Sequence, residues 1–188
     1  MSNPQEFYAA ALALVQGASP DPAYLRRALL LSEVMRRFAA FLGRDAEAET
    51  YAAAGLLRPM CAGSTPLLSA AALKKIGTAE RLLRAVTAPE ADAAERDDFA
   101  TLLVTLDHLV ALILAIALTR PKQSVKGLKV SAVQKKFLEP RFAPQSSRRQ
   151  IQAGVRALHL EIGDFTSKTL KAILASEEGV RNAIEKIA

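Results

Sequence analysis

The sequence has 188 residues, a formal net charge of +6 and a hydrophobic content of 51%, which suffices for one well-packed domain. The single cysteine and two histidines exclude an intramolecular disulfide and any cysteine-rich or histidine-rich metal site. Abundant alanine and leucine favour close-packed helices, while the basic charge is compatible with an acidic partner without specifying one.

Capping side chains, prolines and glycines divide the first part of the chain into helices. Asn3-Pro4 and Asp21-Pro22 each place a capping residue before a proline at the first helical position. In the helix that begins at Pro22, the residues expected to face the core are Leu30, Val34, Phe38 and Phe41. In chain order, we expect helices from Pro4, from Pro22 to Leu42, from Asp45 to Pro59, from Thr65 to Gly77 and from Thr78 to before Pro89.

A long apolar helix is expected next. Asp92 and Glu95 resemble a capping box at its start, and Pro121 ends it after Arg120. Its most apolar stretch, Leu109–Leu118, is too short to span a bilayer and is interpreted as part of a buried helix. The polar N-terminus lacks the features of a signal peptide, so we expect a cytoplasmic protein without a membrane partner. No stretch alternates with a period of two, so strands are not expected.

The composition changes after Arg120, where the chain becomes polar and strongly basic. Between residues 120 and 149, nine lysines and arginines are opposed by one glutamate, so this segment carries +8. The residues expected to form a basic surface are Lys122, Lys126, Lys129, Lys135, Lys136 and Arg141. Short helices are expected from Ser131 to Glu139, from Ser147 to His159 and from Asp164 towards the C-terminus. We predict an all-α protein with a helical core over residues 1–120 and a basic C-terminal helical subdomain, residues 121–188, packed on it.

Four stretches of the sequence carry a family resemblance. They are RRALLLSEVMRRFAAFLG at 26–43, AETYAAAGLLRPM at 48–60, LDHLVALILAIALTRPKQSVKGLKVSAVQKKFLEPRFA at 106–143 and DFTSKTLKAIL at 164–174. Together they resemble the HD-domain superfamily of metal-dependent phosphohydrolases, in particular a small bacterial branch of predicted hydrolases. The resemblance covers most of the chain after Asp21 and implies an HD-domain-like helical bundle.

The resemblance also implies a set of metal ligands, most of which this sequence lacks. In the family, an early histidine, an adjacent His-Asp pair and a later aspartate hold a divalent ion that activates water and neutralises a phosphate ester. The corresponding residues here are Arg27, then Arg58 and Pro59, then Asp107, while a further family histidine corresponds to Pro89. Arginine cannot donate a lone pair to a metal and proline has no ligand side chain, so only Asp107 remains. We therefore expect no bound metal, no cofactor and no metal-dependent hydrolysis.

Arg27 and Arg58 leave two interpretations open. If the family fold is kept, both guanidinium groups point towards the former metal pocket, near Asp107. Either the two arginines form an anion site that binds a phosphate directly, or Asp107 pairs with an arginine and the pocket is purely structural.

Three functions are compatible with these observations. The first is a catalytically inactive HD-domain-like protein that acts as a binding, regulatory or oligomerisation module, for instance for an anion or nucleotide. Its partner would be a phosphate-containing small molecule or, in a homodimer, a second copy of the chain. The second is a phosphohydrolase that acts on a nucleotide or phosphorylated small molecule through an altered site. The third is a nucleic-acid-associated protein that uses the basic segment, although no nucleic-acid-binding motif occurs.

The histidines and the cysteine have simpler interpretations. His108 cannot readily share an ion with Asp107, because consecutive side chains on a helix point about 100° apart, and it is expected at the helix surface or partly buried. His159 is expected near a helix C-terminus, where the helix dipole favours a cation. Cys61 is expected in a loop and is interpreted as a small apolar filler rather than a nucleophile.

Overall fold

The computed structural model describes residues 3–63, 65–88 and 96–187. Within these ranges all regular secondary structure is helical, which confirms the prediction of an all-α protein. In chain order the elements are α1 (Pro4–Gly17), α2 (Pro22–Phe41), η1 (Asp45–Glu47), α3 (Ala48–Cys61), α4 (Ala70–Lys75), α5 (Glu80–Thr87), α6 (Asp98–Leu118), α7 (Val130–Phe137), α8 (Arg148–Ala157) and α9 (Ile162–Ile187).

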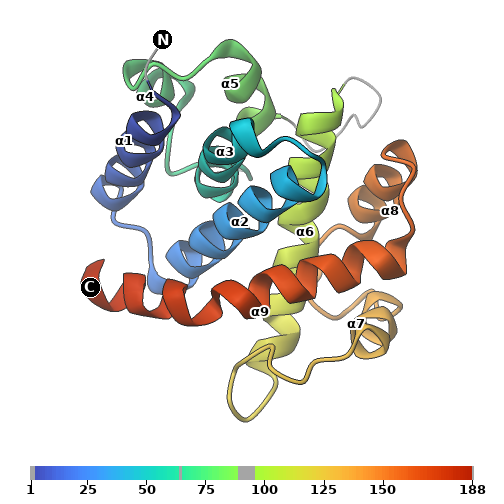
Figure 1. Cartoon of the computed structure of the whole chain (residues 1–188). Coiled ribbons are helices and arrows are strands. Elements are labelled where there is room, and N and C mark those ends of the chain that lie inside the picture. The colour runs from blue at the N-terminus through green and yellow to red at the C-terminus, as the bar shows by residue number, and fades with distance from the viewer. Residues whose placement is uncertain (1–2, 64, 89–95, 188) are drawn as a thin grey trace.

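Helix α6 lies at the centre of the molecule. Buried residues occur along almost its whole length, from Phe99 to Ala117, and α2, α8 and α9 are arranged around it (Figure 1). By length and composition α6 could cross a membrane, but 89% of its most apolar window is buried inside the protein. The interpretation of Leu109–Leu118 as part of a buried helix is therefore confirmed.

Helices α2 and α3 form a closely packed pair. α2 begins after Asp21, whose carboxylate accepts hydrogen bonds from two backbone N–H groups of the first turn. It is followed by Gly43, whose φ of 67° is a conformation that glycine adopts without steric cost. Gly55 of α3 lies directly against the α2 backbone at Leu31. The two helices therefore approach each other without a side chain between them at this point.

The C-terminal helices cover the core. α9 crosses in front of α2 and α6 in the view of Figure 1, and α8 lies beside α6. The rings of Phe38 in α2 and Phe165 in α9 meet edge to face, with centroids 5.2 Å apart. Gly154 of α8 lies against Thr105 of α6. Side chains from both sides of residue 120 thus belong to one hydrophobic cluster.

The C-terminal end of α3 differs from the prediction. We expected the helix to end at Pro59, but it continues to Cys61. A proline removes one backbone donor, yet the N–H of Ala62 still donates to the carbonyl of Arg58 at 3.0 Å. Because the whole last turn is buried, its packing outweighs the lost hydrogen bond.

The starts of α4 and α5 also differ from the prediction. α4 begins at Ala70 and not at Thr65, because the hydroxyl of Ser69 accepts a hydrogen bond from a first-turn N–H and caps the helix. Thr78 does not cap α5. Its hydroxyl donates to the carbonyl of Leu73 at 2.7 Å and so satisfies the end of α4.

The remaining starts are shifted by a few residues. Asp97 caps α6 by accepting a hydrogen bond from a first-turn N–H, whereas the expected capping pair, Asp92 and Glu95, lies outside the described residues. α7 begins at Val130 and α9 at Ile162, one and two residues before their predicted starts. Residues that can cap a helix, such as serine, threonine and aspartate, occur at many positions in this sequence. The local sequence therefore does not show which of them caps a helix.

Candidate functional site

Arg27, Arg58 and Asp107 lie far apart in the sequence but meet in the structure, where α2, α3 and α6 each contribute one of them. Nε and Nη2 of Arg27 donate to Oδ1 of Asp107 at 3.1 and 2.6 Å. Nε of Arg58 lies 3.6 Å from Oδ2 of the same carboxylate. We call these three residues the ion triad. Each oxygen of Asp107 therefore faces a guanidinium group.

Arg58 is deeply buried, with 1% of its side chain exposed. Its Nη1 donates to the backbone carbonyls of Val86 at 3.1 Å and Ala88 at 2.8 Å, at the end of α5. Backbone carbonyls at the C-terminal end of a helix lack hydrogen-bond donors within that helix. Arg58 of α3 supplies such a donor and thereby caps the C-terminal end of α5. Arg27, with 25% of its side chain exposed, is the member of the triad that reaches solvent.

The triad geometry corresponds to the direct ion pair rather than to an open anion pocket. Of the other expected ligand positions, Pro59 is buried within α3, and Pro89 lies outside the described residues. In the described ranges, no group of three or more histidine, cysteine or carboxylate side chains is placed to hold a metal ion. The arrangement can neutralise a buried carboxylate and tie three helices together.

His108 and Cys61 are both buried, in contrast to the positions expected for them. Nδ1 of His108 accepts a hydrogen bond from the backbone N–H of Ser147 at 3.2 Å, which joins α6 to the start of α8. Cys61 is the last residue of α3 and belongs to the hydrophobic cluster. Burial raises the pKa of the Cys61 thiol to about 11, and the nearby Arg58 guanidinium opposes this only in part. A thiol that keeps its proton is a poor nucleophile, which supports the interpretation as an apolar filler.

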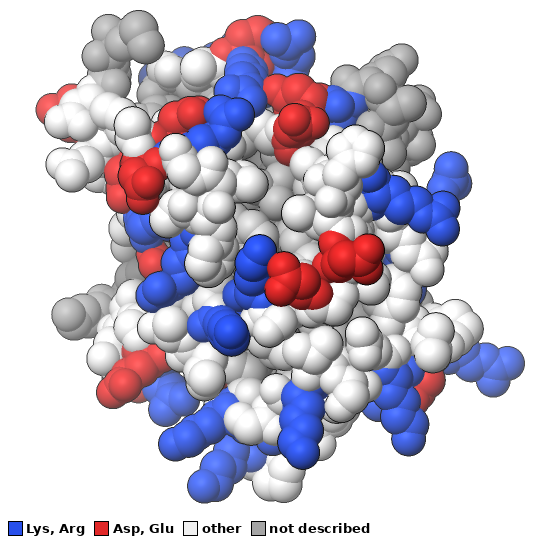
Figure 2. Space-filling model, turned by 45° about the vertical axis from the view of Figure 1, so that its right-hand side comes forward, with Lys and Arg blue, Asp and Glu red and all other residues white. Residues whose placement is uncertain are grey.

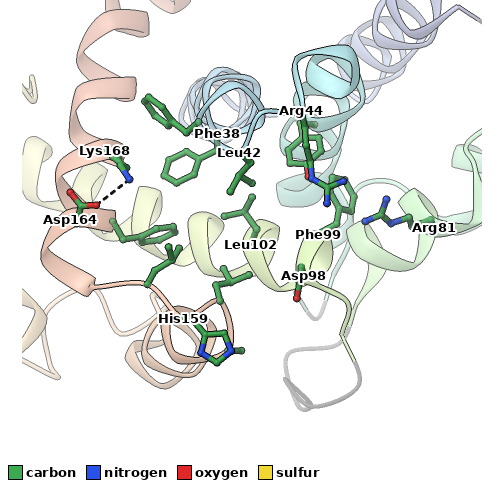
Figure 3. Close-up of a pocket in the computed structure, with 16 residues that line it drawn as sticks. Phe38, Leu42, Arg44, Arg81, Asp98, Phe99, Leu102, His159, Asp164 and Lys168 are labelled. Carbon is green, nitrogen blue, oxygen red and sulfur yellow. Dashed lines mark ion pairs between the residues drawn. The ribbon is translucent and has the colours of Figure 1, made fainter.

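A groove of about 440 Å³ lies beyond the C-terminal end of α2 (Figure 3). Its walls come from the end of α2, the start of α3, the first turns of α6 and the region where α8 leads into α9. The apolar residues that line it are Phe38, Phe41, Leu42, Tyr51, Phe99, Leu102, Ala157, Leu158, Leu160 and Phe165. Because a helix rises about 1.5 Å per residue, Phe38 lies about 16 Å along α2 from Arg27 of the ion triad. The groove and the ion triad are therefore distinct sites, at different positions along α2.

The cations at the groove are paired with carboxylates. The ion pairs are Arg44–Glu47 at 3.0 Å, Arg81–Asp97 at 2.9 Å and Lys168–Asp164 at 3.1 Å, the last drawn dashed in Figure 3. The Arg81 guanidinium also lies over the ring of Phe99, 5.0 Å from its centroid. The groove therefore presents apolar and aromatic walls without an excess of positive charge.

Sequence reasoning missed this groove. Phe41 was expected in the core, but it is 53% exposed and forms a groove wall together with its neighbour Leu42. His159, with a φ of 53°, follows the end of α8 and lies at the edge of the groove (Figure 3). Two large apolar residues directly before the helix stop at Gly43 were the only local signal of an apolar surface there.

The basic segment is largely solvent-exposed. Figure 2 shows lysine and arginine side chains along the lower edge of the molecule, the end formed by α7 and the connection before it. The exposed members are Lys122, Lys126, Lys129, Lys135, Arg141 and Arg149. Lys136 is half-buried, pairs with Glu139 at 2.7 Å and lies over the ring of Phe142. Arg148 donates to several backbone carbonyls between residues 136 and 146, so it holds the α7–α8 connection together.

Comparison of the chain with family models, curated proteins and solved structures found no match. The functional interpretation therefore depends on the residues and the geometry described above.

Proposed function

We propose that this chain is a catalytically inactive relative of the HD-domain phosphohydrolases that acts as a binding module for a small, largely apolar ligand. The ion triad supports the inactive character, and the groove supports the binding role. The proposal depends above all on one observation, the burial of Arg58 against Asp107 at positions where the family has metal ligands.

The physical chemistry of the triad favours an inactive protein. A guanidinium keeps its charge at every relevant pH, so Arg27 and Arg58 repel a divalent cation from Asp107. A buried arginine is costly to leave without a carboxylate, which favours the present arrangement over an open one. Activation of water by a metal needs several neutral or anionic ligands around one ion, and the triad offers a single carboxylate.

The groove has the size and lining of a ligand site. Sites for small molecules typically enclose roughly 300–1,000 Å³ and are lined mainly by apolar and aromatic side chains. The volume of about 440 Å³ falls in this range. Since the cations at the groove already have carboxylate partners, a phosphate ester would have to displace them. We therefore assign the groove to an uncharged ligand with rings or an aliphatic chain.

A second candidate is an anion at the solvent-exposed side of Arg27. The triad has two guanidinium groups for one carboxylate, so it carries an excess positive charge, and Arg27 is 25% exposed. A phosphate-containing molecule would use that charge. If so, inorganic phosphate should raise the melting temperature of the native protein but not of Arg27→Gln, with ionic strength held constant by chloride. Equal shifts in the two proteins would exclude this site.

Metal analysis and an activity screen test the inactive character. We expect purified protein to contain far less than one manganese, iron or nickel ion per chain. We also expect no turnover of nucleotides or phosphorylated small molecules when these metals are added. Stoichiometric metal, with turnover that disappears in Asp107→Ala, would show an active hydrolase instead.

Binding of an uncharged fluorescent dye tests the groove. Nile red should bind the native protein with an increase in fluorescence. Ala157→Trp should abolish this increase, because Ala157 lines the groove and an indole would fill it. Ala175→Trp is the matched control, since Ala175 is exposed on α9 and does not line the groove. Equal fluorescence from the two variants would rule out the groove as the binding site.

A further inference from the structure

The charge of this chain is unevenly distributed. The whole chain carries +6, and residues 120–149 alone carry +8, so the remaining residues sum to −2. The cations of this segment lie along the lower edge in Figure 2, whereas acidic and basic side chains are mixed over the upper part. We call this end, with the exposed residues Lys122, Lys126, Lys129, Lys135, Arg141 and the α9 residue Lys171, the basic end. Such a distribution orients the molecule in front of an anionic surface.

Large leucine side chains are exposed next to these cations. Leu138, directly after α7, is 80% exposed, and Leu118, the last residue of α6, is 56% exposed. Tyr24, Phe41, Leu42 and Leu67 are also exposed but line hollows elsewhere in the protein. At the basic end, therefore, leucines project outwards among positive charges, where they are available to a partner surface.

A hollow at the same end combines the two features. Between the 125–130 stretch and α9, a cavity of about 340 Å³ is lined by Leu128, Leu170 and Leu174, with Lys129 and Lys171 beside them. Neither lysine forms an ion pair with a described carboxylate. An apolar hollow beside two available ammonium groups fits a molecule with an acyl chain and a phosphate group.

We propose that the basic end docks onto a bilayer surface that contains anionic phospholipid. The lysines attract the negatively charged headgroups, and Leu118 and Leu138 enter the interfacial layer, as apolar side chains do in peripheral membrane proteins. Nucleic acid fits this surface less well. Single-strand binding relies on exposed aromatic side chains, but Phe137 and Phe142 are half-buried, and Lys136 covers the ring of Phe142. This docking is independent of the groove and of the triad.

Vesicle sedimentation with the full chain tests the proposal. The protein should bind vesicles of phosphatidylcholine mixed with phosphatidylserine, should not bind phosphatidylcholine alone, and should be released by high salt. The variant with Lys126→Gln and Lys135→Gln should bind about 25-fold more weakly, since each lysine near such a surface contributes about fivefold. The control variant, Lys74→Gln with Lys75→Gln, removes the same charge from α4 near the opposite end and should bind like the native protein.

The leucines provide a second, independent readout. Leu138→Asn should weaken binding to the anionic vesicles about tenfold, whereas Leu67→Asn, which is exposed elsewhere, should have no effect. Circular dichroism verifies that each variant keeps its helices. The proposal is overturned if the control lysine pair matters as much, or if neutral vesicles bind equally well. It is also overturned if duplex DNA or single-stranded RNA binds more tightly than vesicles in the same buffer and Leu138→Asn leaves that binding unchanged.

Discussion

The ion triad places opposite charges where water hardly reaches them. Asp107 is 2% exposed and Arg58 1% exposed, so both lose their hydration on folding, and their attraction offsets that cost only in part. Removal of one partner is worse, because it leaves the other charge buried without compensation. A single substitution at Asp107 or Arg58 should therefore destabilise the protein strongly, whereas replacing both residues together should destabilise it less than the two single effects combined.

We predict that Asp107→Leu lowers the free energy of unfolding by about 3–5 kcal/mol. Arg58→Met should have a similar effect, but the double variant should lose clearly less than the sum, since the partly exposed Arg27 can turn to solvent. Urea denaturation of the four proteins measures this coupling. As a control, Asp164→Ala breaks the exposed pair with Lys168 and should cost less than about 1 kcal/mol. Strict additivity in the cycle would contradict the buried ion pair.

The buried thiol of Cys61 makes a prediction about pH. Burial raises its pKa from 9.0 to about 11, with Arg58 partly opposing. Between these values the unfolded chain has released the proton and the folded chain has kept it. The free energy of unfolding therefore falls as pH rises from about 9 to 11, by up to about 1.4 kcal/mol per pH unit. The contribution is constant below pH 9, where both states are protonated.

Comparison with Cys61→Ala isolates this effect, because the titration of lysines is common to both proteins. The difference in unfolding free energy between native protein and variant should be constant up to about pH 9 and should shrink above it. Chemical denaturation at a series of pH values provides the measurement. A difference that stays flat through pH 11 would mean that the folded thiol titrates normally.

The candidate site could be predicted only in part. The family resemblance predicts that Arg27, Arg58 and Asp107 lie close together, and these three residues do meet in the structure. The bonds from Arg58 to the end of α5 had no signal in the sequence, because backbone carbonyls are present at every residue. The groove is assembled from segments between Phe38 and Lys168. Its existence depends on how helices cross, which local patterns do not encode.

At the scale of helices, two glycines allow a close approach, Gly55 between α3 and α2 and Gly154 between α8 and α6. A Cβ at Gly55 would lie 2.6 Å from the backbone oxygen of Leu31, so α2 and α3 could no longer approach as they do. A Cβ at Gly154 would overlap the Thr105 hydroxyl, which is buried and donates to the carbonyl of Thr101 at 2.6 Å. The first obstacle is backbone and cannot move aside, whereas the second is a side chain that can be shortened.

We predict that Gly55→Ala and Gly154→Ala each destabilise the protein, by about 1–3 kcal/mol, with Gly55→Ala at the upper end. Thr105→Ala should recover part of the loss in Gly154→Ala and none of the loss in Gly55→Ala. Gly179→Ala serves as the control, since a Cβ there meets nothing within 4 Å. In the exposed interior of α9 it should stabilise by about 0.5–1 kcal/mol. Thermal and urea unfolding would contradict these crossings if all three alanines behaved alike.

The helices themselves were largely predictable, and their ends were not. Asn3 and Asp21 cap α1 and α2 as expected, because each directly precedes a proline at the first helical position. The sequence predicts a helix end at Pro59, since proline lacks a backbone donor, but tertiary packing keeps the last turn of α3. Thr78 resembles a cap in sequence and instead bonds back to Leu73. The error at Pro59 arises from packing between segments distant in the sequence, whereas the error at Thr78 arises from a competing hydrogen bond within the same turn region.

At the scale of the whole molecule, the basic C-terminal part supplies a share of the core. Phe165 and Ile173 of α9, and Ile151 and Val155 of α8, are buried in the same cluster as the side chains of α2 and α6. If residues 121–188 only packed against a core that was complete without them, the faces of α2 and α6 beneath them would be polar. Here the covered faces of α2 and α6 are apolar, as at Phe38 and Leu102.

We therefore predict that residues 1–120 alone do not fold cooperatively, although the sequence suggested a core with that boundary. Without residues 121–188, the faces of α2 and α6 that contact α8 and α9 would be exposed to water. The stability of a typical domain is only about 5–15 kcal/mol, so the loss of several buried side chains removes a large part of it. The full chain should unfold in a single transition by circular dichroism, whereas the fragment should show a broad transition or aggregate in size-exclusion chromatography. Addition of the separate 121–188 fragment should restore part of the cooperative transition, because the missing contacts are non-covalent. A fragment 1–120 that melts as sharply as the full chain would instead show that the C-terminal helices are dispensable for the core.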